Sequence, residues 1–296
     1  MKKIKDLISN FINGFCMALA DSVPGVSGGT IAFILGFYDK FISSLDDLFR
    51  GSLEKKKSAL VFLIKLGIGW AVGFLLSASI LSGLFETHIY VMSSLFIGFI
   101  VAAIPLVIKE EKKCLRGKYR YLIFTFIGIC LVVSISLLNS YGGFNFDINN
   151  FNIINLIYVF VTAAVAITAM VLPGISGSTL LLIFGLYIPI MGAIKEILHF
   201  NFNLLPVIIV FGLGIVCGIV FFVKLIRRSL ELFRSQTIYM VIGMMIGSLY
   251  SICMGPTTLD VPKEMLSFET FNIFFFLLGI IIILLLELLK NFLNKE

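Results

Sequence analysis

Apolar stretches alternate with short polar or charged segments along the whole chain. Most of the stretches are close to the roughly 20 residues that an α-helix needs to cross the hydrocarbon core of a bilayer. The connecting segments are short, which leaves no room for a separate soluble domain. The pattern therefore predicts an all-α polytopic membrane protein, with apolar runs near 7–20, 28–45, 59–83, 88–108 and 119–138, and again near 152–171, 174–195, 204–226, 237–254 and 271–289.

The two sets of runs are copies of one another. Residues 24–30 (PGVSGGT) and 173–179 (PGISGST) lie 149 positions apart, and each interrupts an apolar stretch. We therefore divide the chain into two repeats, 1–150 and 151–296, which together form one transmembrane domain. Hydrophobic segments broken by Gly and Pro at corresponding places in two repeats are typical of a transport site. The same offset matches Gly36, Tyr38, Ile89, Tyr90 and Gly98 with Gly185, Tyr187, Ile238, Tyr239 and Gly247.

Composition agrees with a membrane protein, since 59% of the residues are hydrophobic, 14% are charged and the mean hydropathy is +1.07. The net charge of +6 does not indicate a nucleic-acid partner, because the basic residues cluster in short loops where membrane topology accounts for them. The five cysteines and two histidines show neither a paired spacing nor the spacing of metal ligands. We therefore expect no disulfide framework, metal site or cofactor.

Basic clusters on both sides of the first motif determine how it threads through the membrane. Residues 2–5 carry three lysines before the motif, and residues 50–57 carry one arginine and three lysines after it. By the positive-inside rule both clusters lie in the cytoplasm, so residues 7–45 enter the membrane and return as a hairpin. A hairpin plus three spans crosses the membrane an odd number of times. The sequence therefore predicts two inverted repeats, with both termini in the cytoplasm.

Two kinds of hairpin would return to the starting side: a re-entrant pair of short helices and a pair of full spans. We favour the re-entrant form because the leading arm has only about 15 apolar residues, fewer than a span needs. The Pro-Gly-x-Ser-Gly tip is also non-helical backbone, which must be buried in protein or face water.

Each motif has the features of a helix N-terminus that points into the membrane interior. Pro at a helix start costs no hydrogen bond, and Ser and Thr cap the first turn. The free backbone N–H groups and the positive end of the helix dipole favour an anion. Two tips facing one cavity at the midplane would hold a phosphate. The candidate substrate-binding residues are Pro24, Gly25, Ser27, Gly28, Gly29, Thr30, Pro173, Gly174, Ser176, Gly177, Ser178 and Thr179.

Close helix packing is the alternative role for small residues in a membrane. For the motifs we prefer binding, because both copies keep Pro, Gly, Ser, Gly and Thr in register, whereas packing needs only small side chains. We assign packing to the small-xxx-small pairs elsewhere, which are Gly69 and Gly73, Gly214 and Gly218, and Gly243 and Gly247.

Asp21 and Lys65 are the candidates for coupling or for pairing with substrate charge. Asp21 lies beside the first motif in an apolar run, where an ionisable group marks a functional candidate. It either couples transport to a proton or sodium gradient or caps the hairpin tip. Lys65 either reaches a substrate phosphate or snorkels to the cytoplasmic surface, and we favour snorkelling. The same choice applies to Lys40, Arg227 and Arg228.

Residues 20–30 (ADSVPGVSGGT), the second motif and residues 243–249 (GMMIGSL) resemble the bacterial polyprenyl-phosphate transporter family, formerly a membrane domain of unknown function. The resemblance covers essentially the whole chain. It implies a flippase, not an enzyme, that returns undecaprenyl phosphate, the lipid carrier of cell-wall synthesis, to the cytoplasmic leaflet of the bacterial plasma membrane. The implied partners are this lipid and the membrane lipids, and an oligomer is compatible with the sequence.

Two other functions would use similar hairpins. Undecaprenyl-diphosphate phosphatases have a Pro-Gly-x-Ser-Arg-Ser pattern, but here Gly28 and Gly177 occupy the arginine position. No Glu-rich segment lies in an apolar run either, so the groups needed for phosphoryl transfer are lacking. An inorganic anion channel or exchanger would need only the helix tips, and it remains the main alternative.

Overall fold

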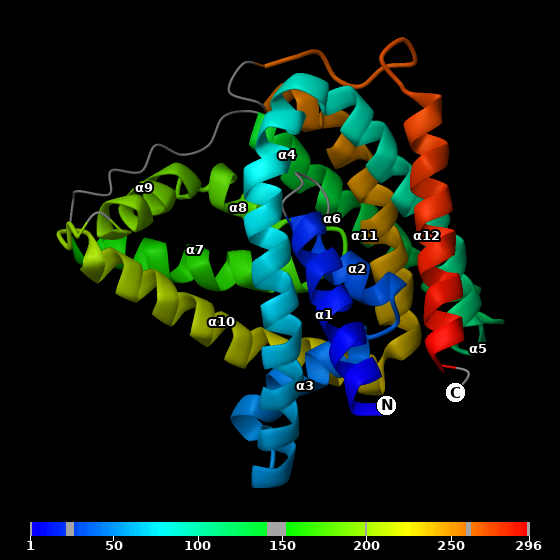
Figure 1. Ribbon diagram of the computed structural model, residues 1–296, viewed down its shortest axis with the longest axis horizontal. Helices are drawn as coiled ribbons and strands as arrows, with labels where there is room; N and C mark the ends of the chain where they lie inside the picture. Colours follow the sequence, from blue (N-terminus) through cyan, green and yellow to red (C-terminus); the bar gives the residue numbers. More distant parts are fainter. Residues whose placement is uncertain (1, 22–26, 141–151, 199, 259–261, 295–296) are drawn as a thin grey trace.

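The computed structural model describes residues 2–21, 27–140, 152–198, 200–258 and 262–294, and every regular element in these ranges is a helix. The first half contains α1 (Lys2–Asp21), α2 (Gly28–Ile34), α3 (Tyr38–Arg50), α4 (Leu53–Glu110), α5 (Lys112–Leu115), η1 (Tyr119–Tyr121) and α6 (Leu122–Ser140). The second half contains α7 (Ile153–Val171), α8 (Gly177–Ile183), α9 (Tyr187–Leu198), α10 (Leu205–Leu232), α11 (Arg234–Met254), η2 (Gly255–Thr258) and α12 (Ile273–Asn294). In Figure 1 both chain ends lie at the same end of the molecule as α3 and α5.

Six helical segments of the described residues are long and apolar enough to cross a membrane, so the chain is a multi-pass membrane protein. They are Leu53–Leu76, His88–Glu110, Tyr119–Leu138, Ile153–Val171, Leu205–Leu232 and Arg234–Thr257. Ile273–Leu285 in α12 is a shorter apolar helix. Their positions agree with the apolar runs of the sequence, because the hydropathy of a span is a local property that needs no tertiary information.

The hairpin arms differ from the prediction in two ways. The leading arms α1 and α7 have 20 and 19 residues. At 1.5 Å per residue each is about 30 Å long. Among the described helices α7 is apolar enough to span a membrane, so the expectation of a short leading arm was wrong for the second repeat; α1 is not among the candidate spans, because its first turns are charged. Each trailing run is also two helices rather than one, because the chain breaks at Gly36 (φ 71°) and Gly185 (φ 65°), in a region that favours glycine.

A second pair of breaks separates the spans that follow. Figure 1 shows α4 rising in cyan and returning in teal, and the only non-helical dihedrals inside it are those of His88 (φ −126°, ψ 37°). Phe233, between α10 and α11, has nearly the same dihedrals (φ −127°, ψ 39°). The two halves therefore turn at similar places with similar backbone geometry, although their orientation relative to a membrane stays a prediction.

The helices of the two halves interlock. Within each half the leading arm packs on the next long helix, as α1 does on α4 and α7 on α10. The last spans are exchanged, because α12 packs on α4 of the first half and α6 on α11 of the second. Glycines make these approaches close: a Cβ atom on Gly98 would lie 2.2 Å from the carbonyl oxygen of Phe276, and one on Gly243 would lie 2.1 Å from that of Thr125. The packing role predicted for Gly243 is confirmed.

Candidate functional site

The two motifs meet inside the chain and bond directly to one another. The Ser27 hydroxyl donates to the carbonyl oxygen of Leu172 at 3.0 Å, with the carbonyl oxygen of Met170 at 3.2 Å. In return, the backbone N–H of Gly174 donates to the Thr30 hydroxyl oxygen at 2.8 Å. The structure thus brings together the two predicted tips across more than 140 residues of sequence.

The tips are docked rather than held apart. A Cβ atom on Gly29 would lie 2.5 Å from the carbonyl oxygen of Val171, so no side chain fits between the two tips at this point. Ser27, Thr30 and Ser176 are 0%, 1% and 6% exposed. In this conformation the described polar groups of the two tips therefore pair with one another, and the phosphate cavity expected between the tips stays a prediction.

The first tip is organised by a capped helix start and a carboxylate. Ser27 is the N-cap residue of α2, and its hydroxyl oxygen accepts from the N–H of Gly29 at 3.1 Å. The next free N–H, that of Gly28, donates to the Asp21 carboxylate at 2.7 Å. The other carboxylate oxygen of Asp21 accepts from the Trp70 indole N–H at 3.0 Å. Asp21 therefore makes the capping contact that the sequence allowed for, and its coupling role stays a prediction.

The second tip uses the same motif without this polar support. Offsetting Asp21 and Trp70 by 149 positions gives Met170 and Ile219, which have apolar side chains. Gly174 takes a positive φ of 84°, where a Cβ atom would also meet the carbonyl oxygen of Met244 at 2.6 Å. Only a glycine fits this position, so Gly174 shapes the second tip through its backbone.

The remaining motif residues complete the placement of the candidates. Pro173 is buried, and Thr179 is half-buried in the first turn of α8, which begins at Gly177. Pro24 and Gly25 lie outside the described residues, as does the side chain of Ser178.

Lys65 is not at the tips. Its ammonium group bonds to the Asp6 carboxylate at 2.6 Å, near the beginning of α1, whereas the tip follows the end of α1. The separation is about 20 Å along the axis of α1. The hydrogen bond from Lys65 lowers the pKa of Asp6 below its ordinary value. In this conformation Lys65 pairs with a carboxylate of the protein.

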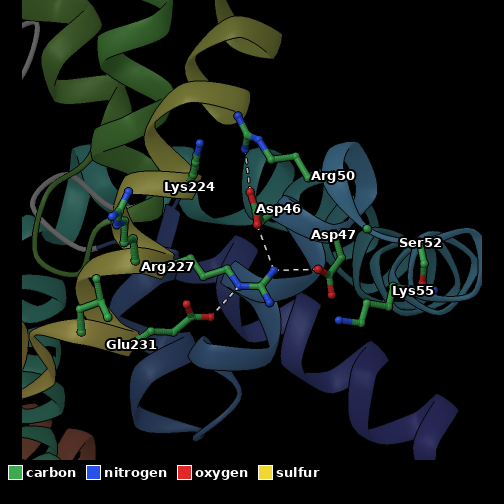
Figure 2. Close-up of a pocket in the computed structure, with 11 residues that line it drawn as sticks. Asp46, Asp47, Arg50, Ser52, Lys55, Lys224, Arg227 and Glu231 are labelled. Atoms are coloured by element: carbon green, nitrogen blue, oxygen red, sulfur yellow. Dashed lines mark hydrogen bonds and ion pairs between the residues drawn. The ribbon is translucent and has the colours of Figure 1, made fainter.

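A charged pocket of about 630 Å³ lies between α3 and α10, and the sequence reasoning missed most of it. Arg227 of α10 bonds to Asp47 at 2.7 Å and to Asp46 at 3.0 Å, both on α3, as Figure 2 shows. Arg50 donates to Asp46 and to the carbonyl oxygen of Val220, each at 2.7 Å. The contacts of Arg227 with α3 join positions about 180 residues apart, so no local pattern could have found them.

Trp70 was missed as well, although a signal for it exists. It is the single tryptophan of the chain, and it lies in a span whose counterpart has no aromatic residue at the matching position. An intramembrane carboxylate requires donors, and the indole N–H is a donor that tolerates an apolar environment.

Comparisons with known proteins agree with the resemblance noted from the motifs. A family model described as undecaprenyl phosphate translocase-like matches residues 17–270. A polyprenyl-phosphate transporter of Vibrio cholerae is 32% identical over 270 residues, which cover 87% of this chain and 81% of the relative. A polyprenyl-phosphate transporter of Staphylococcus aureus is 32% identical over 254 residues, covering 84% and 87%. No solved structure gives a significant match.

Proposed function

We propose, from the premise that this chain belongs to the undecaprenyl phosphate translocase-like family, that it is a flippase for undecaprenyl phosphate. The proposed reaction is movement of the lipid across the bacterial cytoplasmic membrane, which recycles the carrier for cell-wall synthesis. Both curated relatives are named polyprenyl-phosphate transporters, and the matches cover most of this chain. The proposal includes cytoplasmic termini and inverted repeats, which the charge pattern of the loops supports.

The observation that carries the proposal is the direct contact between the two motif tips. Each tip supplies donors that can bind an anion: the Ser27 hydroxyl from the first half and the Gly174 N–H from the second. In the docked conformation both donors are held by the opposite tip. In the proposed cycle the tips separate, and the same donors turn to the phosphate of the lipid.

This exchange of partners has a physical advantage in a membrane. Unpaired backbone and hydroxyl groups are costly in an apolar interior, so an empty site that remained open would be unstable. Docked tips satisfy these groups when no lipid is bound. A phosphate replaces them with stronger charge-assisted hydrogen bonds, so binding and opening are coupled.

Coupling to a proton or sodium gradient is a further part of the proposal, with Asp21 as the candidate. Asp21→Asn keeps the size of the side chain but removes its charge. If Asp21 couples transport, the Asn variant should bind lipid and lose its response to a gradient. A variant that still responds to the gradient would leave Asp21 with the capping role alone.

The test is a leaflet-exchange assay with the full-length protein in vesicles that contain polyprenyl phosphate, with and without a proton gradient. Ser27→Ala and Ser176→Ala should each weaken lipid binding by about 1 to 3 kcal/mol, the cost of a lost hydrogen bond to a charged group. The double variant should show a non-additive loss, because both residues serve one ligand.

The assay also separates the proposal from its rivals. An anion channel would pass inorganic anions and leave the lipid in its leaflet. A phosphatase would release inorganic phosphate from a polyprenyl diphosphate. Movement of the monophosphate lipid without phosphate release is the result that we expect.

A further inference from the structure

The pocket between α3 and α10 carries more positive charge than its own carboxylates neutralise. Five cationic side chains and three carboxylates line it, so two positive charges are in excess. All three carboxylates are engaged by arginines: Asp46 and Asp47 by Arg227, which also binds Glu231 at 2.9 Å, and Asp46 additionally by Arg50.

Three cations of the pocket make no ion pair within the part of the chain that the structure describes. They are Lys55, Lys224 and Arg228, and all three are exposed. Lys224 and Arg228 are four residues apart on α10, so their like charges lie on one face of the helix. Like charges at this spacing slightly destabilise a helix. A bound anion between the two groups would relieve that repulsion.

The carboxylates give this cluster a fixed framework. Arg227 is held by bonds to two neighbouring aspartates of α3 and by Glu231 one turn further along α10. Figure 2 shows Arg50 and Lys224 extending toward the same side of the pocket from different helices. Cationic groups from two helices therefore converge on one space, and the ion pairs keep the helices at that distance.

We propose that this pocket binds a phosphate monoester dianion through Lys224 and Arg228 of α10, beside Arg50 of α3. The excess of two positive charges matches the charge of the ligand. Guanidinium and ammonium groups are the usual ligands of phosphate oxygens. The ligand is either free inorganic phosphate or the headgroup of a prenyl phosphate, since both present the same group.

This site is distinct from the motif tips, and none of the candidate residues of either tip lines it. It lies at the end of α3, on the side of the molecule where both chain ends are found (Figure 1). In a flippase, the pocket would be a second binding site for the headgroup, at the end of the protein that is predicted to be cytoplasmic. The inference itself concerns binding, and it holds for a protein that binds phosphate here without moving lipid.

The experiment measures phosphate binding to the purified full-length protein in a neutral detergent by calorimetry. Lys224→Gln combined with Arg228→Gln removes two of the three unpaired cations. Lys112→Gln combined with Arg116→Gln is the matched control, because it removes the same residue types at the same spacing from an exposed segment outside the pocket. We expect the Kd for inorganic phosphate to rise at least about 10-fold in the pocket variant and to stay within about 2-fold in the control.

Further probes identify the source of the phosphate group. If farnesyl phosphate displaces inorganic phosphate and farnesol does not, the site accepts a lipid headgroup. If farnesyl phosphate does not compete, the site takes free phosphate. Lys224→Arg should keep binding, and Lys224→Gln alone provides a second variant should the double substitution lower the melting temperature.

The inference is overturned if the parent protein binds no phosphate, if the pocket variant binds as the parent does, or if the control loses binding equally. In these cases the cations serve only to orient the helices in the bilayer. Ser27→Ala with Ser176→Ala serves to separate the two proposals. This variant should lose lipid transport and keep the inorganic phosphate affinity of the pocket, so either proposal can fail alone.

Discussion

The two hairpin tips share a motif but differ in what supports them. The first tip is held by side chains, because Asp21 accepts hydrogen bonds from the Gly28 N–H and from the Trp70 indole. The second has Met170 and Ile219 at the matching positions, 149 residues further along. The comparison teaches that the repeat supplies a paired backbone framework, while the carboxylate next to that framework is provided only once.

The same contrast appears in what surrounds the motif glycines. A Cβ atom on Gly28 would meet the Asp21 carboxylate at 2.7 Å, which is the end of a side chain. On Gly177 it would meet the carbonyl oxygen of Ala166 at 2.8 Å, which is backbone. Backbone lies close to both tips, since Gly29 of the first also faces the carbonyl oxygen of Val171, but only the first tip has a carboxylate against a motif glycine.

The largest effect is expected from cysteine labelling at equivalent positions of the two halves, which tests whether the repeats are inverted. Glu54 and Asn203 are exposed and occupy matching positions in the two halves. In a chain without its five natural cysteines, we expect a cysteine at position 203 to react from outside intact cells and one at position 54 only after permeabilisation. Reaction of both positions from the same side would exclude inverted repeats.

Larger side chains at the motif glycines should have the next largest effect, on lipid transport. Gly28→Val and Gly177→Val each place atoms where the structure has contacts below 3 Å, so we expect lipid transport to fall at least about 10-fold through overpacking of a dense interior. Gly67→Val is the matched control, because a Cβ atom there has no neighbour within 4 Å. Normal transport by both tip variants at normal expression would make the motif a packing element and place the site elsewhere.

Replacing Asp21 and Trp70 by the residue types at the matching positions of the second half measures how much this side-chain support contributes to stability. Asp21→Met and Trp70→Ile each leave unpaired polar groups, so each should destabilise the protein by about 1 to 3 kcal/mol. The double variant should lose less than the sum of the two, since it removes both partners together. Thermal melting of the four proteins gives the cycle, and strict additivity would show that the Asp21–Trp70 contact is not formed.

The smallest effect should come from the glycines at which the two halves are most alike. Gly36→Ala and Gly185→Ala place a side chain at positive φ, which costs about 1 to 2 kcal/mol. We expect equal losses in the free energy of unfolding. Unequal losses, relative to Gly67→Ala as control, would show that the two trailing arms differ as the tips do.

The positions of the membrane spans were predictable from the sequence, because hydropathy is local. The end of α1 beside the motif was predictable too. The length of α1 was not, since its first turns carry lysines and Asp6 and so lack the apolar signal of a span. The breaks at Gly36 and Gly185 were visible as a matched pair, but the sequence does not give the sign of φ.

The candidate site was predictable in its members and only partly in its arrangement. That the two motifs belong together followed from the repeat. That Ser27 and Gly174 bond to the opposite tip depends on how the halves pack. The contact of Arg227 with Asp46 is of the same kind, because it joins residues 181 positions apart on helices of different halves.

Because the last spans are exchanged between the halves, some helix contacts can form only late in synthesis. The second span of α4 packs through Gly98 on α12, which is translated last among the described helices, and α6 packs on α11, which is translated after it. At roughly 5 to 20 residues per second, the face of α4 around Gly98 stays uncovered for about 10 to 40 seconds after synthesis. During this interval the face of α4 around Gly98 is open to contact with any neighbouring helix in the bilayer. A ribosome that stalls before α12 would therefore leave the Gly98 face of α4 uncovered, and we expect membrane proteases to degrade such a chain faster than the full-length protein.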